Sequence, residues 1–337
     1  MSSDTIYGIA TTSMKQCIQT YLALAKTTNA FASVKESDFS DPIARVILLA
    51  GKGADTRISS PAEALLEWSR RTAIPFDVES GVSFGVYVDA RRRGDDLFKL
   101  AETLTKDFTE FDPLTISQTP QLLPIWQHLC GIFSKAALKK EVGSVSDVGI
   151  SRPAGKRISE LLKARVTPSR INKQDILQRL ESTLEGIVRD LVGRLLLESI
   201  VDSALRDNGI TFKRENEYPA LAGVIYDFRA DFVLPDEKNA LAFIEVRKSS
   251  SRHASLYAKD KMFSAINFKG KKKDILAVVV VDGEWTGETL RAMANIFDYV
   301  VPIGQVNELS KTLAAYLKGD KSKLKWLITF KIEPATA

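Results

Sequence analysis

Cysteine and histidine are scarce in this chain, which has 337 residues and contains two of each. With only Cys17 and Cys130, so long a chain is not expected to have a disulfide framework. Together with His128 and His253, these cysteines do not form a zinc-ligand set. Any metal site would therefore have to use carboxylate oxygens, and such ligands favour Mg²⁺ or Mn²⁺.

Long apolar runs are also missing, since no stretch approaches the roughly 20 residues that a membrane-spanning helix needs. The N-terminal segment MSSDTIYGIATTSMKQ lacks the charged head, apolar middle and cleavage site of a signal peptide. An apolar fraction of 45% with 26% charged residues is typical of a soluble globular protein. We therefore expect a cytoplasmic protein without a membrane partner.

The length allows two ordinary domains, and Gly, Ser and Pro cluster over residues 141–155, where we place the boundary. Residues 1–150 are expected to form a mainly helical region that serves DNA recognition or dimerisation. Within it, Ser60 predicts a helix start. The alternation over residues 82–89 predicts a strand, followed by a turn at Arg91–Arg93.

Residues 151–337 read as an α/β domain with a mixed sheet flanked by helices. A long helix, or two joined near Gly193, is predicted from about residue 172 to Asn208. A turn is expected between the first two strands of this domain, and a helix after each of the next three strands. The predicted strands cover residues 227–234, 241–247, 274–282, 299–304 and 323–332.

Two acids stand in strands that otherwise look buried, Asp231 and Glu245. If the hairpin between them is centred on Lys238, the two side chains lie directly opposite each other, roughly 5 Å apart at Cβ. Like charges so close are destabilising unless a cation lies between them. Arg247 shares a face with Glu245, whereas Val246 and Lys248 point the other way. A divalent metal beside a phosphate would account for the acids.

These residues resemble the PD-(D/E)XK nuclease superfamily, which includes many type II restriction endonucleases and archaeal Holliday-junction resolvases. Ala230-Asp231 stands for the family's Pro-Asp, and Glu245-Val246-Arg247 for its (D/E)-x-K. Gly193 to Glu198 is similar to the G-x4-E pattern on the preceding helix. The resemblance covers about residues 185–305, in a domain expected to have a restriction-endonuclease-like core.

The resemblance implies a Mg²⁺-dependent endonuclease, with Mn²⁺ as a possible substitute. Asp231 and Glu245 would bind the metal, with the Val246 carbonyl as a further ligand and Glu198 in support. Water would hydrolyse the phosphodiester without a covalent enzyme intermediate. Among such nucleases, the size favours a type II restriction endonuclease that cuts double-stranded DNA at a specific sequence. Cutting both strands takes two sites, so we expect a homodimer.

Basic side chains gather on both sides of the acids, as a site for a polyanion requires. Arg91–Arg93 is a further candidate phosphate contact, with a solvated loop as the simpler interpretation. The residues expected to contact DNA are Arg152, Lys156, Arg157, Arg165, Arg170, Ser249, Ser251, Arg252, Lys259 and Lys261.

Arginine at position 247 departs from the family's lysine, because it keeps its proton and clamps phosphate as a planar fork. We rank Arg247 itself first for the lysine role, then Lys248 through a bulge, then Lys259 or Lys261. A literal Pro235-Asp236 also exists, but a Pro-Asp pair in a hairpin turn is ordinary turn chemistry. Two other functions stay open: a structure-selective repair or defence nuclease, and a non-catalytic DNA-binding module with a degenerate site.

Overall fold

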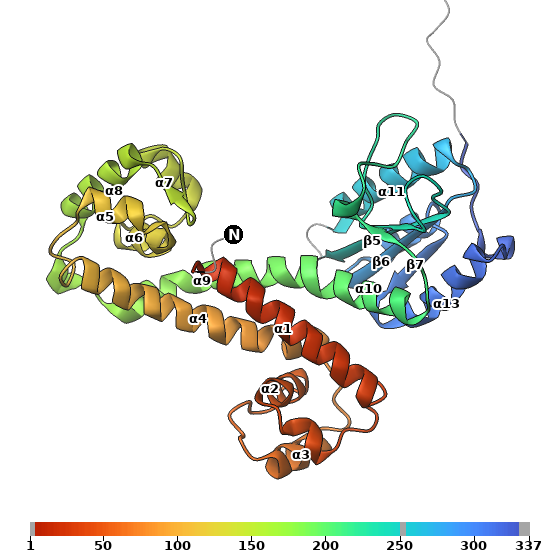
Figure 1. Cartoon of the computed structure of the whole chain (residues 1–337), viewed down its shortest axis with the longest axis horizontal. Helices are drawn as coiled ribbons and strands as arrows, with labels where there is room; N and C mark the ends of the chain where they lie inside the picture. The colour runs from red at the N-terminus through yellow and green to blue at the C-terminus, as the bar shows by residue number, and fades with distance from the viewer. Residues whose placement is uncertain (1–3, 250–253, 330–337) are drawn as a thin grey trace, which may run out of the picture. The chain divides into compact units, whose positions relative to one another are not determined.

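The computed structural model describes residues 4–249 and 254–329. The chain divides into two compact units, unit 1 up to Val192 and unit 2 from Gly193 onward (Figure 1). The division therefore falls after residue 192, not after residue 150 as the Gly, Ser and Pro cluster suggested. The cause is packing, because the helices that follow residue 150 lie against earlier helices of unit 1.

In its described residues, from residue 4 onward, unit 1 is helical apart from one short hairpin. Several of its helices begin with an Asp or Ser N-cap followed by proline in the first turn, a strong start signal. Ser60 is one of these N-caps, as the sequence predicted. The elements are α1 (Ile6–Thr27), α2 (Pro42–Gly51), α3 (Pro61–Arg70), α4 (Val78–Leu104), α5 (Pro113–Gln118), α6 (Leu123–Leu129), α7 (Lys135–Val142), β1 (Val145–Ser146), β2 (Gly149–Ile150), α8 (Arg152–Arg165) and α9 (Lys173–Leu191).

The strand expected over residues 82–89 is wrong, because this segment lies inside α4. Its alternating apolar residues are also pairs spaced four apart, and such pairs share one face of a helix. Val82 and Val86 form the buried pair, each fully inaccessible, whereas Phe84 and Val88 are each 40% exposed. The same four residues thus fit the two-residue period of a strand and the spacing of a helix. The burial of Val82 and Val86 in unit 1 favours the helix.

The turn expected at Arg91–Arg93 is wrong for the same reason, since all three arginines continue α4. Arg91 forms an ion pair with Glu181 at 2.6 Å, and Arg92 pairs with Asp89 at 3.2 Å. Arg93 donates two hydrogen bonds to a backbone carbonyl near the N-terminus. These contacts account for the arginines within unit 1, and their expected role in phosphate binding stays a prediction.

Unit 2 is a five-stranded mixed sheet with helices on both faces, as the sequence predicted (Figure 1). The strands lie in the order β3-β4-β5-β6-β7; β3, β4 and β5 pair antiparallel, and β5, β6 and β7 pair parallel. Their bounds are β3 (Lys213–Arg214), β4 (Phe232–Leu234), β5 (Ala242–Ser249), β6 (Leu276–Gly283) and β7 (Tyr299–Pro302).

Two apolar layers enclose this sheet. Helices α10 (Leu197–Asp207) and α13 (Val306–Leu317) pack on one face, against residues such as Ile244 and Val278. Helices α11 (Ala254–Lys271) and α12 (Gly287–Ala294) cover the other face, against Phe243 and Val279. A π-helical segment, Val192–Leu196, joins α9 to α10, so the predicted helix has its joint near Gly193.

The hairpin register is confirmed, although β4 is shorter than the strand expected over residues 227–234. Phe232 pairs with Ile244 and Leu234 with Ala242, the pairing expected for a loop centred on Lys238. Asp236 accepts hydrogen bonds from the backbone N–H groups of Lys238 and Asn239. The literal Pro-Asp pair is therefore turn chemistry.

The strand expected over residues 323–332 is wrong for residues 323–329, and residues 330–332 lie outside the described part of the chain. The backbone N–H groups of Lys325 and Trp326 donate to Asp298 Oδ1, each at 2.8 Å. Lys269 donates to the Trp326 carbonyl. Side chains thus use backbone groups that a strand ladder would need. Among the described residues, no helix combines the length and the apolar character needed to cross a bilayer.

Candidate functional site

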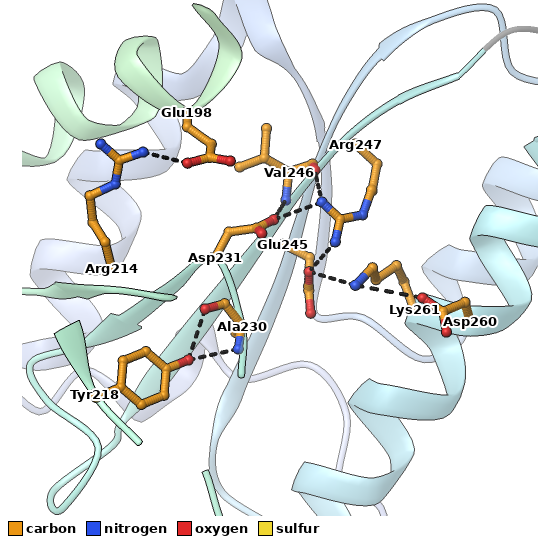
Figure 2. Close-up of polar contacts among 10 residues, drawn as sticks. All are labelled: Glu198, Arg214, Tyr218, Ala230, Asp231, Glu245, Val246, Arg247, Asp260 and Lys261. Carbon is orange, nitrogen blue, oxygen red and sulfur yellow. Dashed lines mark hydrogen bonds and ion pairs between the residues drawn. The ribbon is translucent and has the colours of Figure 1, made fainter. Parts of the chain in front are cut away.

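Asp231 and Glu245 come together in unit 2, on the face of the sheet that α11 covers (Figure 2). Asp231 immediately precedes β4, and Glu245 lies in the middle of β5, where the confirmed register sets them opposite each other. Asp231 is 6% exposed and Glu245 is fully buried. Buried carboxylates need compensating partners, so the surrounding contacts decide what this pair can do.

The Arg247 guanidinium lies between the two carboxylates (Figure 2). Its Nη1 donates to Asp231 Oδ2 at 3.1 Å and to the Val246 carbonyl at 2.6 Å. Its Nη2 donates to Glu245 Oε2 at 3.3 Å. One cation thus joins three oxygens that the sequence analysis assigned to a metal, and the prediction that Arg247 shares the face of Glu245 is confirmed.

Asp231 is also held by the backbone around it. Its Oδ2 accepts a hydrogen bond of 2.6 Å from the Val246 N–H. The residue before it, Ala230, donates its N–H to the Tyr218 hydroxyl, which in turn donates to the Ala230 carbonyl. These two hydrogen bonds with the buried Tyr218 hydroxyl fix the backbone of Ala230, the position where the related pattern has proline. Tyr218 was not identified from the sequence, because it lies outside any regular pattern.

Lys261 is the second cation at the acids, and it comes from α11. Its Nζ lies 3.1 Å from Glu245 Oε2 and 5.1 Å from the Phe228 ring centroid, and the residue is 4% exposed. Lys248 lies 3.6 Å from Asp282 instead, and Lys259 is exposed. Of the lysines considered, Lys261 is thus the one in contact with an acid of the pair, although the sequence ranking placed it behind Lys248.

Glu198, on α10, forms an ion pair with Arg214 of β3 (Figure 2). Burial raises its pKa, and the Asp231 charge raises it further, while Arg214 lowers it. The Asp231 charge therefore acts on the Glu198 carboxyl group. Arg214 is the cation that Glu198 contacts, whereas Asp231 and Glu245 share Arg247.

Electrostatics make Glu245 the unusual member of the site. Burial, followed by the neighbouring Asp231 charge, raises its pKa to about 8, against the lowering effect of Lys261 and Arg247. Its Oε1 is buried and has no hydrogen-bond partner among the described residues. Buried polar atoms without partners are uncommon, and they often mark a binding position. The carboxylate thus has one oxygen available to a ligand.

The donor set suits a hard divalent cation in part. In the described part of the chain, no three His, Cys, Asp or Glu side chains gather closely enough to hold a metal ion. Mg²⁺, however, is commonly held by one or two carboxylates plus substrate phosphates. Asp231, the unpartnered Oε1 of Glu245 and the Val246 carbonyl are oxygen donors of this kind. Arg247 already bonds Asp231 Oδ2 and the Val246 carbonyl, so a metal on these two oxygens and the Arg247 guanidinium exclude each other there.

The basic residues expected to contact DNA divide between the two units. Within unit 1, Arg152, Lys156, Arg157 and Arg165 lie on α8, and Arg170 follows it. Arg157 and Arg165 donate to backbone carbonyls of their own unit. In unit 2, Ser249 ends β5 and is buried. Ser251 and Arg252 lie outside the described residues.

The chain matches no family model, no curated protein and no solved structure. The case for a function therefore depends on the geometry of the acids and their two cations.

Proposed function

We propose that this protein is a Mg²⁺-dependent endonuclease that hydrolyses phosphodiester bonds of double-stranded DNA, with its active site at Asp231, Glu245 and Lys261. The observation that carries the proposal is the buried pair of opposed carboxylates with a free oxygen on Glu245 and two cations in contact. Buried acids destabilise a fold, so their presence on an otherwise apolar sheet favours a chemical role.

Asp231 and Glu245 would hold the metal through their oxygens, with the Val246 carbonyl beside them. When bound, Mg²⁺ supplies a Lewis acid that lowers the pKa of water and offsets phosphate charge. Lys261 holds a positive charge 3.1 Å from Glu245, where it orients that carboxylate and stabilises negative charge on the phosphate. The Val246 N–H and Tyr218 keep Asp231 in place.

Sequence specificity and the type II restriction activity follow from the resemblance to the PD-(D/E)XK superfamily. The mixed sheet, with acids at the start of one strand and within the next, supports a restriction-endonuclease-like core. Lys261 on α11 supports a lysine that has moved from the strand to the following helix. A homodimer would bring two such sites to the two strands of DNA.

The test is cleavage of a defined plasmid with Mg²⁺. The wild type should give discrete fragments, and Asp231→Asn should lose cleavage at least 100-fold while it still binds DNA. Asp227→Asn is the matched control, since Asp227 is an exposed acid four positions earlier. A smear or junction-specific products would favour a structure-selective repair or defence nuclease. Equal cleavage by wild type and Asp231→Asn would refute the proposed site.

The Arg247 contacts favour a second candidate, a DNA-binding module with a degenerate site. Here the guanidinium is the permanent cation of the acids, held by Asp231, Glu245 and the Val246 carbonyl. Such a module binds DNA without Mg²⁺ and shows no cleavage for Asp231→Asn to remove. The same plasmid assay, run with a binding measurement in EDTA, separates the two candidates.

A further inference from the structure

A polar pocket lies within unit 1, well separated along the chain from Asp231 and Glu245. It has a volume of about 180 Å³ and is bounded by the end of α6, the segment after α8 and the first turns of α9. Its polar lining includes His128, Arg165, Arg170, Asn172, Asp175 and Arg179. None of them contributes to the site proposed for cleavage.

His128 is the feature of this pocket that lacks an explanation in the fold. The residue is 2% exposed, and neither ring nitrogen has a hydrogen-bond partner among the described residues. Burial lowers its pKa, and the nearby Arg179 charge lowers it further. The neutral ring keeps one N–H donor and one acceptor. Because buried polar side chains are nearly always paired, a ligand in the pocket would supply the missing partner.

The charges around His128 favour an anion. Three arginines and one aspartate line the pocket, and Glu141 pairs with Arg165, which leaves an excess of one positive charge (three less two). Arg165 is held in place by the Cys130 carbonyl at 3.2 Å and by Glu141 at 2.8 Å. Arg179 lies 5.7 Å from the Phe133 ring centroid. Arginine forks fixed in this way bind phosphate oxygens through paired hydrogen bonds.

The helix α9 adds its N-terminus to the same pocket. It has 19 residues, and its N-cap Asn172 accepts a hydrogen bond from the Gln174 N–H, so the first turn is well formed. The N-terminus of a helix favours anions through its dipole and its unsatisfied N–H groups. Asp175 in that turn opposes this effect in part, and the three arginines outweigh it.

We propose that this pocket binds a terminal phosphate group, either inorganic phosphate or a phosphomonoester such as the 5'-phosphate of a nucleic-acid strand. A phosphomonoester carries a charge of about −1.5 to −2 at neutral pH, so Arg170 and Arg179 attract it more strongly than a singly charged phosphodiester. The inference does not depend on the nuclease activity, because every residue involved lies in unit 1.

Isothermal titration of the full-length protein tests the pocket directly. The probes are inorganic phosphate and a short oligonucleotide with either a 5'-phosphate or a 5'-hydroxyl. We expect saturable binding of inorganic phosphate or of the 5'-phosphorylated strand, weakened at least 10-fold in Arg179→Gln and Arg170→Gln. Arg152→Gln is the control, because Arg152 is exposed on α8 and does not line the pocket. A 5'-phosphate preference assigns the source to a strand end, and binding of phosphate alone assigns it to a free anion.

Proton NMR supplies a readout at the His128 ring itself. The chain has two histidines, so the His128 ring signal is identified by its loss in His128→Gln. Phosphate should shift this signal in the wild type and leave it unchanged in Arg179→Gln. The proposal is overturned if neither probe shifts it, or if Arg152→Gln and Arg179→Gln weaken binding equally.

Discussion

Replacement of Arg247 by methionine removes the guanidinium that joins Asp231 and Glu245, and methionine keeps the unbranched stem of the side chain. The wild-type guanidinium is bonded to Asp231, Glu245 and the Val246 carbonyl, and its side chain is 31% exposed. In Arg247→Met, Lys261 still pairs with Glu245, but Asp231 loses its ion pair. The variant therefore leaves the buried Asp231 carboxylate with the Val246 N–H and without a paired cation.

The size of the effect follows from this geometry. Removing one partner of a buried ion pair costs about 3–5 kcal/mol of unfolding free energy, and the partial exposure of Arg247 favours the lower end. A domain of roughly 150 residues loses about 4 °C of melting temperature for each kcal/mol. Arg247→Met should therefore melt roughly 10 °C below the wild type when EDTA removes divalent ions.

Added Mn²⁺ should restore much of that loss. A metal present at about 100 times its Kd stabilises the folded state by about 2.7 kcal/mol. Without the guanidinium, the metal no longer competes for Asp231 and Glu245, so the Mn²⁺-induced rise should be larger in Arg247→Met than in the wild type. Thermal melts followed by circular dichroism measure both effects, with Arg229→Met as the control for an exposed arginine. Equal melting of Arg247→Met and the wild type, with and without Mn²⁺, would refute the reasoning.

Three further predictions concern Lys261, Glu245 and the two cysteines. Lys261→Met should reduce plasmid cleavage about 100-fold with DNA binding retained, whereas the exposed Lys311→Met should not; equal rates would remove Lys261 from the site. Because burial raises the folded-state pKa of Glu245 to about 8, the folded state keeps a proton that the unfolded chain releases. The free energy of unfolding should therefore fall as the pH rises from about 5 to 8. Melts in EDTA should show a flatter pH profile for Glu245→Gln, and parallel profiles would contradict this. Burial raises the thiol pKa of Cys17 to about 11 and of Cys130 to about 12, so Ellman's reagent at pH 8 should react with them only after unfolding; fast reaction of the native protein would contradict this.

The acids and their register could be predicted because a local signal fixes them. The turn that contains Asp236 sets the centre of the hairpin, and the two-residue period of a strand then sets Asp231 against Glu245. The buried strand β6 was equally clear, since a continuous apolar run has few other solutions next to a parallel neighbour.

Lys261 could not be selected from the sequence, because the rotation of α11 against the sheet depends on packing. Several lysines of that helix were equivalent until the contact with Glu245 was known. The strand prediction for residues 82–89 was wrong for a different reason, since the spacing of Val82 and Val86 fits a strand and a helix equally well. The prediction of the last strand was wrong because the backbone N–H groups of Lys325 and Trp326 donate to Asp298, which is distant in sequence.

Anomalous scattering from crystals soaked in Mn²⁺ and a phosphodiester oligonucleotide tests whether the two acids bind a metal. We expect a Mn²⁺ peak bound by Asp231 and Glu245, with the Arg247 guanidinium moved away from both carboxylates. Asp231→Asn should lose that peak. An Arg247 guanidinium still bonded to the two acids, with no Mn²⁺ peak beside them in the wild type, would rule out a metal site at this pair.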